Sequence, residues 1–122
     1  MSIKPRVLEL VSLFENGRFI EALETFYDDR VAMQENLADP TVGRDANIAR
    51  ERAFFGGITI HESRARSVVV DGDRAVINWW LDYTAADGQR YRIDELAVQE
   101  WRNGKIVSER FVYDTATMAE RN

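Results

Sequence analysis

The chain has 122 residues, 45% apolar and 30% charged, a globular composition that argues against disorder and supplies one hydrophobic core but not two. Acidic residues outnumber basic ones by 21 to 16, so nucleic acid is a poor partner, and no apolar run approaches the ~18 residues of a membrane span. With no cysteine for a disulfide or a thiolate nucleophile, we expect one soluble domain over residues 1–122, cytoplasmic and without a targeting segment.

The first quarter of the sequence has the apolar spacing of two consecutive helices. Apolar residues recur at i, i+3, i+4 and i+7 from Val7 to Phe14, and Gly17 follows where a helix C-terminal cap is expected. The same stripe recurs from Phe19 to Phe26, which predicts a short second helix that ends near residues 27–29. The two helices should meet at Gly17.

A short strand and a third helix come next. Residues 31–36 predict the strand, and Asp45 is a suitable N-cap for a helix that ends at Gly56. Arg50, Glu51 and Arg52 are expected on a solvated face of this helix.

From residue 58 onward the pattern changes to long β-like segments separated by turn dipeptides. Asp71-Gly72, Asp87-Gly88 and Asn103-Gly104 are each flanked by alternating apolar residues, which is typical of antiparallel hairpins. The predicted strands are 58–70, 75–84, 89–102 and 105–113. Three N-terminal helices followed by a strongly bent sheet predict an α+β fold.

Pairing across these turns divides the sheet residues between two faces. We assume a two-residue turn at Asn103-Gly104 and an even-numbered loop at Asp87-Gly88. The predicted inner face carries Ile77, Trp79, Leu81, Tyr83, Asp94, Leu96, Val98, Val107, Glu109, Phe111 and Tyr113.

The opposite face is predicted to hold Trp80, Glu95 and Trp101. Because two tryptophans on an outer face suggest a covered surface, we predict a homodimer through the Trp80/Trp101 side of the sheet.

The first long strand could turn either of its two sets of alternate side chains toward the core. Placing His61, Ser63, Ala65 and Ser67 inward avoids burying unpaired arginines, and it requires an odd loop or a bulge near residues 71–73.

The sequence MQEN, at residues 33–36, places candidate acid–base groups at the end of a strand. Strand alternation allows Gln34 or Glu35 to face inward but not both. Glu35 is either a general base beside an apolar cavity, with a raised pKa, or a solvent-facing strand end.

Two further side chains are candidates for proton transfer. Asp94 lies between aromatic residues of the predicted inner face, and the alternative is an ion pair with Arg92 at the rim of the sheet. His61, the only histidine, is either a proton shuttle or a hydrogen-bonded strand histidine. With neither a second histidine nor a cysteine, we expect no metal site.

The order of elements and four motifs resemble the NTF2-like superfamily, and within it the SnoaL-like and ketosteroid-isomerase-like proteins. The motifs are FYDD (26–29), TVGR (41–44), DGDRAVINW (71–79) and WRNGKIVSERFVYD (101–114). The resemblance covers nearly the whole chain and implies an NTF2-like cone, in which three N-terminal helices pack on a strongly curved mixed or antiparallel sheet.

The isomerase-like members bind an apolar ligand in the cone, where an acidic side chain with a tuned pKa moves a proton. Their helix-one tyrosine falls on Leu10 of this chain. Their general base falls on Gln34, with Glu35 beside it, and their second acid falls on Leu96 or, in an alternative alignment, on Asp94.

The resemblance implies a SnoaL-like protein that binds a hydrophobic small molecule without a cofactor. One expectation is isomerase or polyketide-cyclase-like chemistry by acid–base proton transfer, and the alternative is a non-catalytic binding or association module with a filled cone. A cavity of roughly 300 Å³ or more with an acid in its wall would favour the first. The catalytic candidates are Glu35, Asp94 and His61. The ligand-binding candidates are Gln34, Phe55, Trp79, Tyr83, Glu109, Phe111 and Tyr113.

Overall fold

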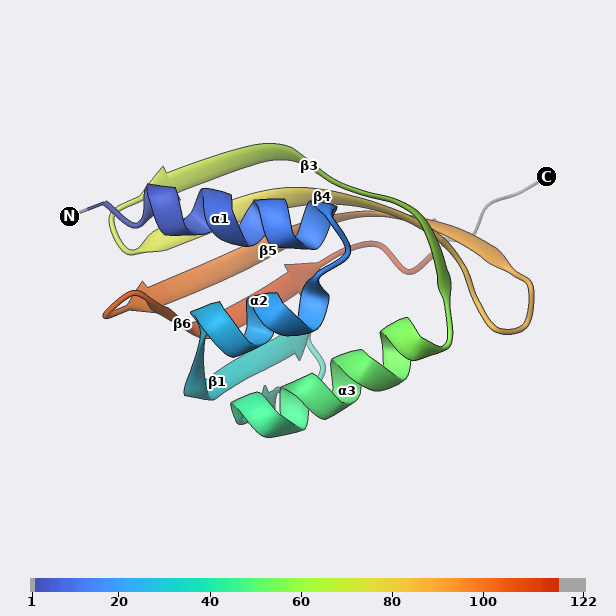
Figure 1. Cartoon of the computed structure of the whole chain (residues 1–122), viewed down its shortest axis with the longest axis horizontal. Coiled ribbons are helices and arrows are strands. Elements are labelled where there is room, and N and C mark those ends of the chain that lie inside the picture. Colours follow the sequence, from blue (N-terminus) through green and yellow to red (C-terminus); the bar gives the residue numbers. More distant parts are fainter. Residues whose placement is uncertain (1, 117–122) are drawn as a thin grey trace.

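The computed structural model describes residues 2–116, which form three helices on one face of a six-stranded mixed sheet (Figure 1). The strand order is β2-β1-β6-β5-β4-β3, in which β1 runs parallel to β6 and every other neighbouring pair is antiparallel. The predicted α+β class is confirmed. The elements are α1 (Lys4–Glu15), α2 (Phe19–Phe26), β1 (Tyr27–Glu35), β2 (Thr41–Val42), α3 (Arg44–Gly56), β3 (Thr59–Asp71), β4 (Arg74–Thr84), β5 (Arg90–Arg102) and β6 (Lys105–Val112).

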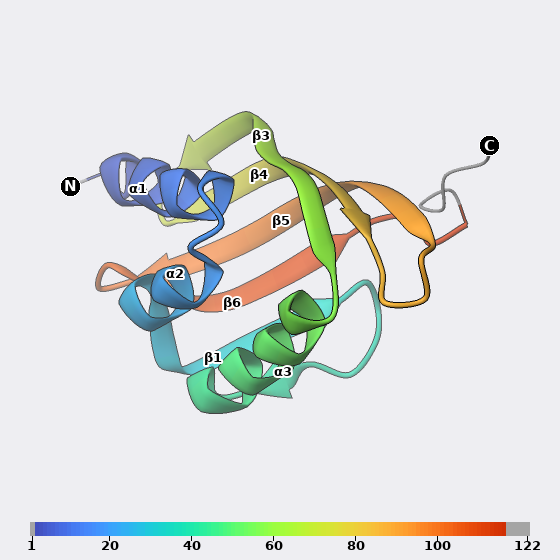
Figure 2. The same ribbon diagram turned by 45° about the vertical axis from the view of Figure 1, so that its right-hand side comes forward.

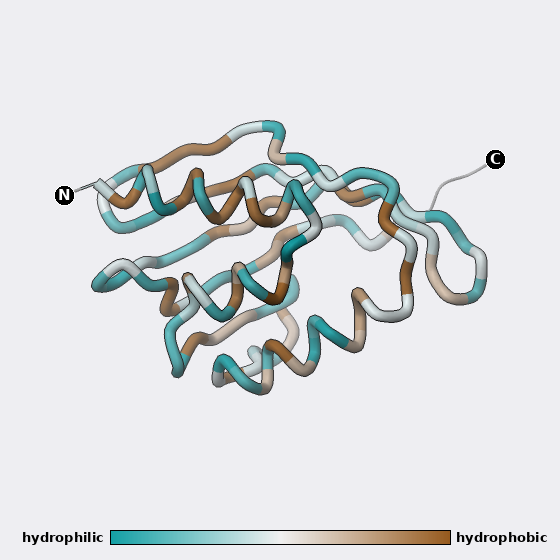
Figure 3. Tube along the Cα trace, viewed as in Figure 1, coloured by the Kyte–Doolittle hydropathy of each residue, from teal (hydrophilic) through white to brown (hydrophobic). Residues whose placement is uncertain are grey.

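Helices α1 and α2 form where the apolar spacing predicts them. Pro5 occupies the first turn of α1, where its missing N–H costs no helical hydrogen bond, and Leu10 on the apolar stripe is fully buried. The helix ends at Glu15, and Gly17, just beyond the C-cap, has a φ of +75°, a left-handed conformation that suits glycine. The hydrophobic residues recur along one side of both helices in Figure 3. That periodicity is why both helices bury a face on the sheet.

The core lies between these helices and the concave side of the sheet, which curves behind them in Figure 2. Trp101 is 2% exposed and packs edge-on against Phe26 of α2, with ring centroids 6.2 Å apart. Within residues 2–116, no helix has the length and apolar character needed to cross a bilayer.

Helix α3 is fixed at its start by a buried asparagine. The amide of Asn47 donates to the carbonyl oxygens of Thr41 at 3.0 Å and Gly43 at 2.8 Å, and this side chain is fully buried. The predicted cap, Asp45, instead lies in the first turn, because the N-cap is Gly43 and the helix begins at Arg44, two residues earlier than predicted. These bonds tie α3 to the β2 edge and so fix the face that it turns toward the sheet.

Strand β1 is longer than the predicted 31–36, since the chain enters it directly from α2 at Tyr27. Its parallel pairing with β6 brings Glu35 beside Phe111. Two segments far apart in the sequence, β1 and β6, therefore lie side by side in the sheet.

The predicted inner face is correct for β4 and wrong for β5. Thr84 pairs with Arg90, so the hairpin loop contains five residues, 85–89, and not an even number. An odd loop turns every β5 side chain to the opposite face. Glu95 consequently lies beside Trp79 on the inner face. The β5 residues that were predicted to face inward, Asp94, Leu96 and Val98, lie on the outer side.

A bulge in β6 restores Glu109 and Phe111 to the inner face. The Asn103-Gly104 turn pairs Trp101 with Ile106 as predicted, but the register then shifts by one residue and Gln99 pairs with Glu109. Trp101 lies in the core, so the prediction that it shares an outer face with Trp80 is wrong.

Strand β3 follows the predicted parity only at its centre. Ser63 pairs with the inward Leu81, and Ala65 pairs with Trp79. Register shifts near residues 61 and 66 leave His61 and Ser67 exposed, contrary to prediction, because each bulge changes the parity of the side chains beyond it.

Candidate functional site

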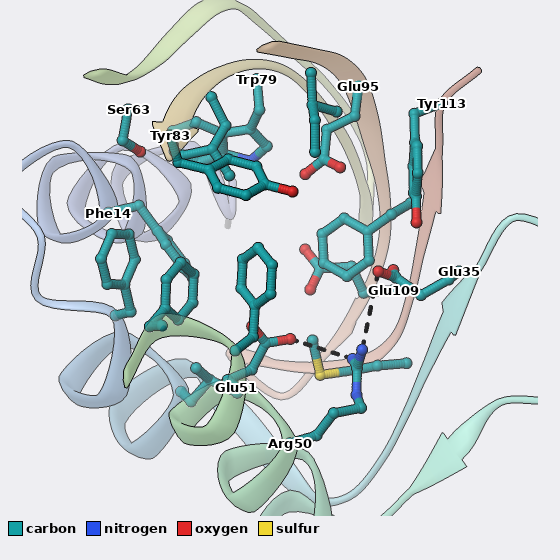
Figure 4. A pocket seen from close by; sticks show the side chains of 18 of the residues that line it. Phe14, Glu35, Arg50, Glu51, Ser63, Trp79, Tyr83, Glu95, Glu109 and Tyr113 are labelled. Atoms are coloured by element: carbon teal, nitrogen blue, oxygen red, sulfur yellow. Dashed lines mark ion pairs between the residues drawn. The ribbon is translucent and has the colours of Figure 1, made fainter. Parts of the chain in front are cut away.

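A cavity of about 400 Å³ lies between the helices and the concave side of the sheet (Figure 4). Side chains from α1, α2, α3 and strands β1, β3, β4, β5 and β6 line it, so no single element defines the site. Its volume lies within the ~300–1,000 Å³ typical of small-molecule sites.

Aromatic rings form a large part of the wall. Phe19 of α2 stacks on Phe55 of α3 with centroids 4.0 Å apart, and Phe54 meets Tyr83 of β4 edge-on at 5.4 Å. Phe14 of α1 similarly contacts Trp79 at 5.5 Å. These contacts close the side of the cavity between helices and sheet with flat apolar surfaces suited to a hydrophobic or aromatic ligand.

Four carboxyl groups and one guanidinium group share this apolar cavity. They belong to Glu35 of β1, Arg50 and Glu51 of α3, Glu95 of β5 and Glu109 of β6, and Figure 4 shows them around one space. Arg50 lies between two of the acids, 3.2 Å from Oε1 of Glu51 and 3.9 Å from Oε1 of Glu35.

The choice between Gln34 and Glu35 is resolved by strand alternation. Val31 and Met33 are buried in the core, so Glu35 also points inward. The Gln34 amide turns away and donates to the carbonyl oxygen of Ala38 at 3.0 Å. The acid of this pair, not the amide, faces the cavity.

Burial raises the pKa of Glu35, while the charge of Arg50 and hydrogen bonding to Tyr113 lower it. Oε2 of Glu35 is buried without a hydrogen-bond partner among residues 2–116. One oxygen is therefore held near a cation, and the other is left for a group in the cavity.

Glu95 has a different environment. Burial, followed by repulsion from Glu35 and Glu109, raises its pKa to about 8. No hydrogen bond to another described side chain or backbone group opposes this shift. These surroundings favour the protonated form of Glu95, whose carboxyl group points into the cavity (Figure 4).

Glu109 is the deepest of the acids, at 2% exposure. The Tyr27 hydroxyl donates to its Oε1 at 2.5 Å, and the Gln99 amide donates to its Oε2 at 2.6 Å. Trp101 Nε1 in turn donates to the Gln99 oxygen at 3.0 Å. Burial raises the pKa of Glu109 to about 7, although both hydrogen bonds oppose that shift.

Glu51 completes the group of acids. Burial raises its pKa to about 7, while Arg50 opposes the change. Raised pKa values in one cleft are typical of functional sites, since they allow proton exchange near neutrality.

The structure brings most of the predicted site residues together. Those that line the cavity are Glu35, Phe55, Trp79, Tyr83, Glu109, Phe111 and Tyr113. Three predicted residues lie elsewhere. Gln34 turns toward Ala38, and His61 is exposed with Nε2 2.7 Å from Oγ1 of Thr84. Asp94 lies on the outer side of the sheet, 3.6 Å from Arg66.

The sequence reasoning missed Arg50, Glu51 and Glu95. Glu51 lies four residues before Phe55 on α3, so the two share a helix face and both line the cavity. That spacing was a usable signal. The prediction of a solvated face is wrong for Arg50 and Glu51, which line the cavity, whereas Arg52 is exposed as predicted. Glu95 offered no comparable signal, because its direction depends on the length of the preceding loop.

No group of three or more histidine, aspartate or glutamate side chains within residues 2–116 has an arrangement that could hold a metal ion. The four glutamates converge on an aromatic cavity from different elements. Carboxyl groups in such a setting can donate and accept protons.

Comparison with known proteins gives one family and a set of related folds. The family model of the SnoaL-like domain matches residues 7–109. No curated protein sequence matches the chain. Among solved structures, a proposed SnoaL-like polyketide cyclase from Mesorhizobium loti is 25% identical with a TM-score of 0.85, covering 93% of this chain and 100% of that one.

Two other solved structures share the fold at lower identity. An NTF2-like protein from Burkholderia pseudomallei has 21% identity and a TM-score of 0.80, with coverage of 95% of this chain and 94% of its own. An LEH-like epoxide hydrolase from Mycobacterium tuberculosis has 16% identity and a TM-score of 0.76, with coverage of 93% and 84%. The predicted NTF2-like cone is thereby confirmed.

Proposed function

Because the chain belongs to the SnoaL-like domain family, we propose that its cavity binds a small apolar or aromatic carbonyl compound and moves a proton on it without a cofactor. The observation that carries this proposal is the unlike environments of two inward-facing acids, Glu35 and Glu95. An open cavity of about 400 Å³ with acids in its wall supports ligand binding over a filled, purely structural cone.

Glu35 is the proposed general base. Arg50 lies 3.9 Å from its Oε1 and favours the carboxylate, while Oε2 has no hydrogen-bond partner within residues 2–116. A carboxylate with one free oxygen beside an apolar cavity can accept a proton from a carbon next to a carbonyl group.

Glu95 is the proposed acid. With a pKa of about 8 it holds its proton at neutral pH and can donate a hydrogen bond to the substrate oxygen. Two acids whose environments separate their pKa values can act as base and acid in one site. Here the surroundings of the two acids separate their pKa values, since Glu35 lies near Arg50 and Glu95 lies near other acids.

The reaction balances without an outside reagent. Glu35 takes the proton from the α-carbon, the C–H electron pair forms the carbon–carbon double bond of the enol, and the carbonyl oxygen receives the proton of Glu95. In a substrate with a β,γ double bond the enol is a dienol. Transfer of the proton from Glu35 to its γ-carbon, with return of the enol O–H proton to Glu95, then gives the α,β-unsaturated isomer. Alternatively, the enol carbon attacks a second carbonyl group of the same molecule, the enol O–H proton returns to Glu95, and the new alkoxide takes the proton held by Glu35, which gives an aldol-type cyclisation.

The test uses 2-tetralone, a bicyclic aromatic ketone with acidic α-protons. Incubated with the protein in D₂O, it should exchange those protons faster than buffer alone, as followed by NMR. Glu35→Gln should slow the catalysed exchange by about a hundredfold or more, since general-base catalysis contributes ~10²–10⁴-fold.

The matched control is Gln34→Glu, which places an acid on the neighbouring side chain that turns away from the cavity. It should exchange at the wild-type rate. Unchanged exchange in Glu35→Gln, or no exchange by a wild-type protein that saturation-transfer NMR shows to bind 2-tetralone, would contradict the proposal.

A further inference from the structure

Glu109 is a cavity acid that the proposed proton transfer does not use. We propose that it is the anionic recognition group for a protonated amine, so that the preferred ligand is an apolar or aromatic molecule bearing an ammonium group. The inference rests on the proposed function only in taking this cavity as the ligand site, and it adds the chemical class of the ligand.

Both hydrogen bonds at the Glu109 side chain are donated to its carboxyl oxygens. Tyr27 and Gln99 both donate, one to each carboxyl oxygen, which is the pattern that favours a carboxylate. Gln99 cannot reverse its amide without losing the bond from Trp101, because a carbonyl oxygen is required opposite the indole N–H. The protein therefore fixes a donor against Oε2 of Glu109.

Acidic side chains outnumber basic ones in the cavity wall. Arg50 is the only lysine, arginine or histidine that lines the cavity in the described part of the chain, and it already contacts Glu35 and Glu51. Glu109 is 2% exposed and forms no ion pair with a described residue. A buried carboxylate without a counter-charge is costly, so a cationic ligand group would stabilise it.

Glu109 also has unused hydrogen-bonding capacity in the wall of the cavity. A carboxylate has about four acceptor positions, and Glu109 uses one on each oxygen. These acceptors suit the three N–H donors of a primary ammonium group, and the ring of Phe111, which lines the same cavity, is apolar surface that can also face a cation.

A neutral hydroxyl group would donate a hydrogen bond but leave the buried charge uncompensated. The strength of the electrostatic interaction inside a low-dielectric cavity therefore favours ammonium over hydroxyl. The choice can be tested with two probes on the same carbon frame, 2-aminotetralin as the cation and 2-tetralol as the neutral donor.

The experiment is calorimetric titration of both probes near neutral pH. The wild-type protein should bind 2-aminotetralin about tenfold or more tightly than 2-tetralol, the ratio expected for a charge-assisted over a neutral hydrogen bond. Glu109→Gln should remove this preference. Equal affinities in the wild type, or a preference that survives in a folded Glu109→Gln protein, would overturn the proposal.

Tyr27→Phe keeps Glu109 and provides a second test if Glu109→Gln does not fold. It removes one of the two donors that favour the carboxylate, so the ammonium preference should decrease near neutral pH and return in more alkaline buffer. The other titrating groups of the cavity are the same in the wild type and in Tyr27→Phe; they are Glu35, Glu51 and Glu95 and, at higher pH, Tyr83 and Tyr113. A difference in pH dependence between the two proteins therefore reports on Glu109. An unchanged pH dependence would overturn the assignment.

The exchange of 2-tetralone separates this inference from the proposed reaction. Absence of exchange with a retained ammonium preference refutes the reaction and supports the recognition role of Glu109. Catalysed exchange without an ammonium preference supports the reaction and refutes that role.

Discussion

The Tyr27 hydroxyl donates a 2.5 Å hydrogen bond to Oε1 of Glu109, joining two buried residues that lie 82 positions apart in the sequence. Tyr27 begins β1 and Glu109 lies in the parallel neighbour, β6, so this bond forms across the pairing that brings the two ends of the fold together. Burial raises the pKa of Tyr27 well above its usual range, so the hydroxyl remains a donor throughout the neutral range. Tyr27 thus takes part in the pairing of β1 with β6 and also donates a hydrogen bond to an acid of the cavity wall.

Tyr27→Phe should lower the free energy of unfolding by about 1–3 kcal/mol, the cost of leaving a buried acceptor with one donor fewer. The loss should be larger near pH 8 than near pH 5, because the missing bond favours the ionised form of Glu109. Urea denaturation at both pH values measures this. The result would contradict the account if the loss were the same at both.

The stability of the protein should fall as the pH rises from about 5 to about 8. The pKa values of Glu51, Glu95 and Glu109 are raised to about 7, 8 and 7 in the folded state, so the fold retains protons that the unfolded chain releases. Their contribution is fully present below the ordinary glutamate pKa of 4.5 and is lost as the pH rises through the raised values.

The expected decrease in the free energy of unfolding is more than ~1.4 kcal/mol, the equivalent of one pKa unit. Glu95→Gln should make the free energy of unfolding depend less steeply on pH, since one of the three groups no longer titrates. Urea midpoints that rise between pH 5 and pH 8 would show that the acids are not held protonated by the fold.

Ser63→Leu should obstruct the cavity, because Ser63 lies on its wall at the centre of β3. The affinity for 2-tetralone should fall about tenfold, which corresponds to ~1.4 kcal/mol. Ser67→Leu on the same strand is the matched control, since that side chain is exposed and lies outside the cavity wall. Equal effects of the two substitutions in a binding titration would place the ligand elsewhere.

The homodimer stays a prediction, now restricted to the outer face of the sheet around Trp80. The guanidinium of Arg66 lies 4.2 Å from the centre of its ring, and Leu96 on the neighbouring strand is 41% exposed. Trp80→Arg should convert a dimer into a monomer in sedimentation velocity, with Trp80→Phe as the conservative control. A wild-type monomer at micromolar concentration, or a dimer that persists in Trp80→Arg, would count against this surface.

The helices and the class of fold could be predicted because their signals are local. The apolar stripe from Val7 to Phe14 and the terminating Gly17 specify α1 without reference to any distant residue. The same is true of β4, whose alternation correctly places Trp79 inward.

The site was harder to predict because two single-residue features decide which acids face inward. The five-residue loop at 85–89 turns Glu95 into the cavity and Asp94 out of it, and a bulge in β6 returns Glu109 to the inner face. The dipeptides Asp87-Gly88 and Asn103-Gly104 mark the turns but do not encode the loop length or the bulge. The fold was therefore predicted correctly, while Asp94 was predicted to face the cavity in place of Glu95.

The division of roles between Glu35 and Glu95 can be measured by the pH dependence of 2-tetralone exchange. The rate should rise as Glu35 ionises and fall near pH 8 as Glu95 loses its proton, because the reaction needs a base and an acid together. In Glu95→Gln the amide still donates a hydrogen bond but does not titrate, so exchange should be slower and the alkaline decrease should disappear. The same alkaline decrease in wild type and Glu95→Gln would contradict the account.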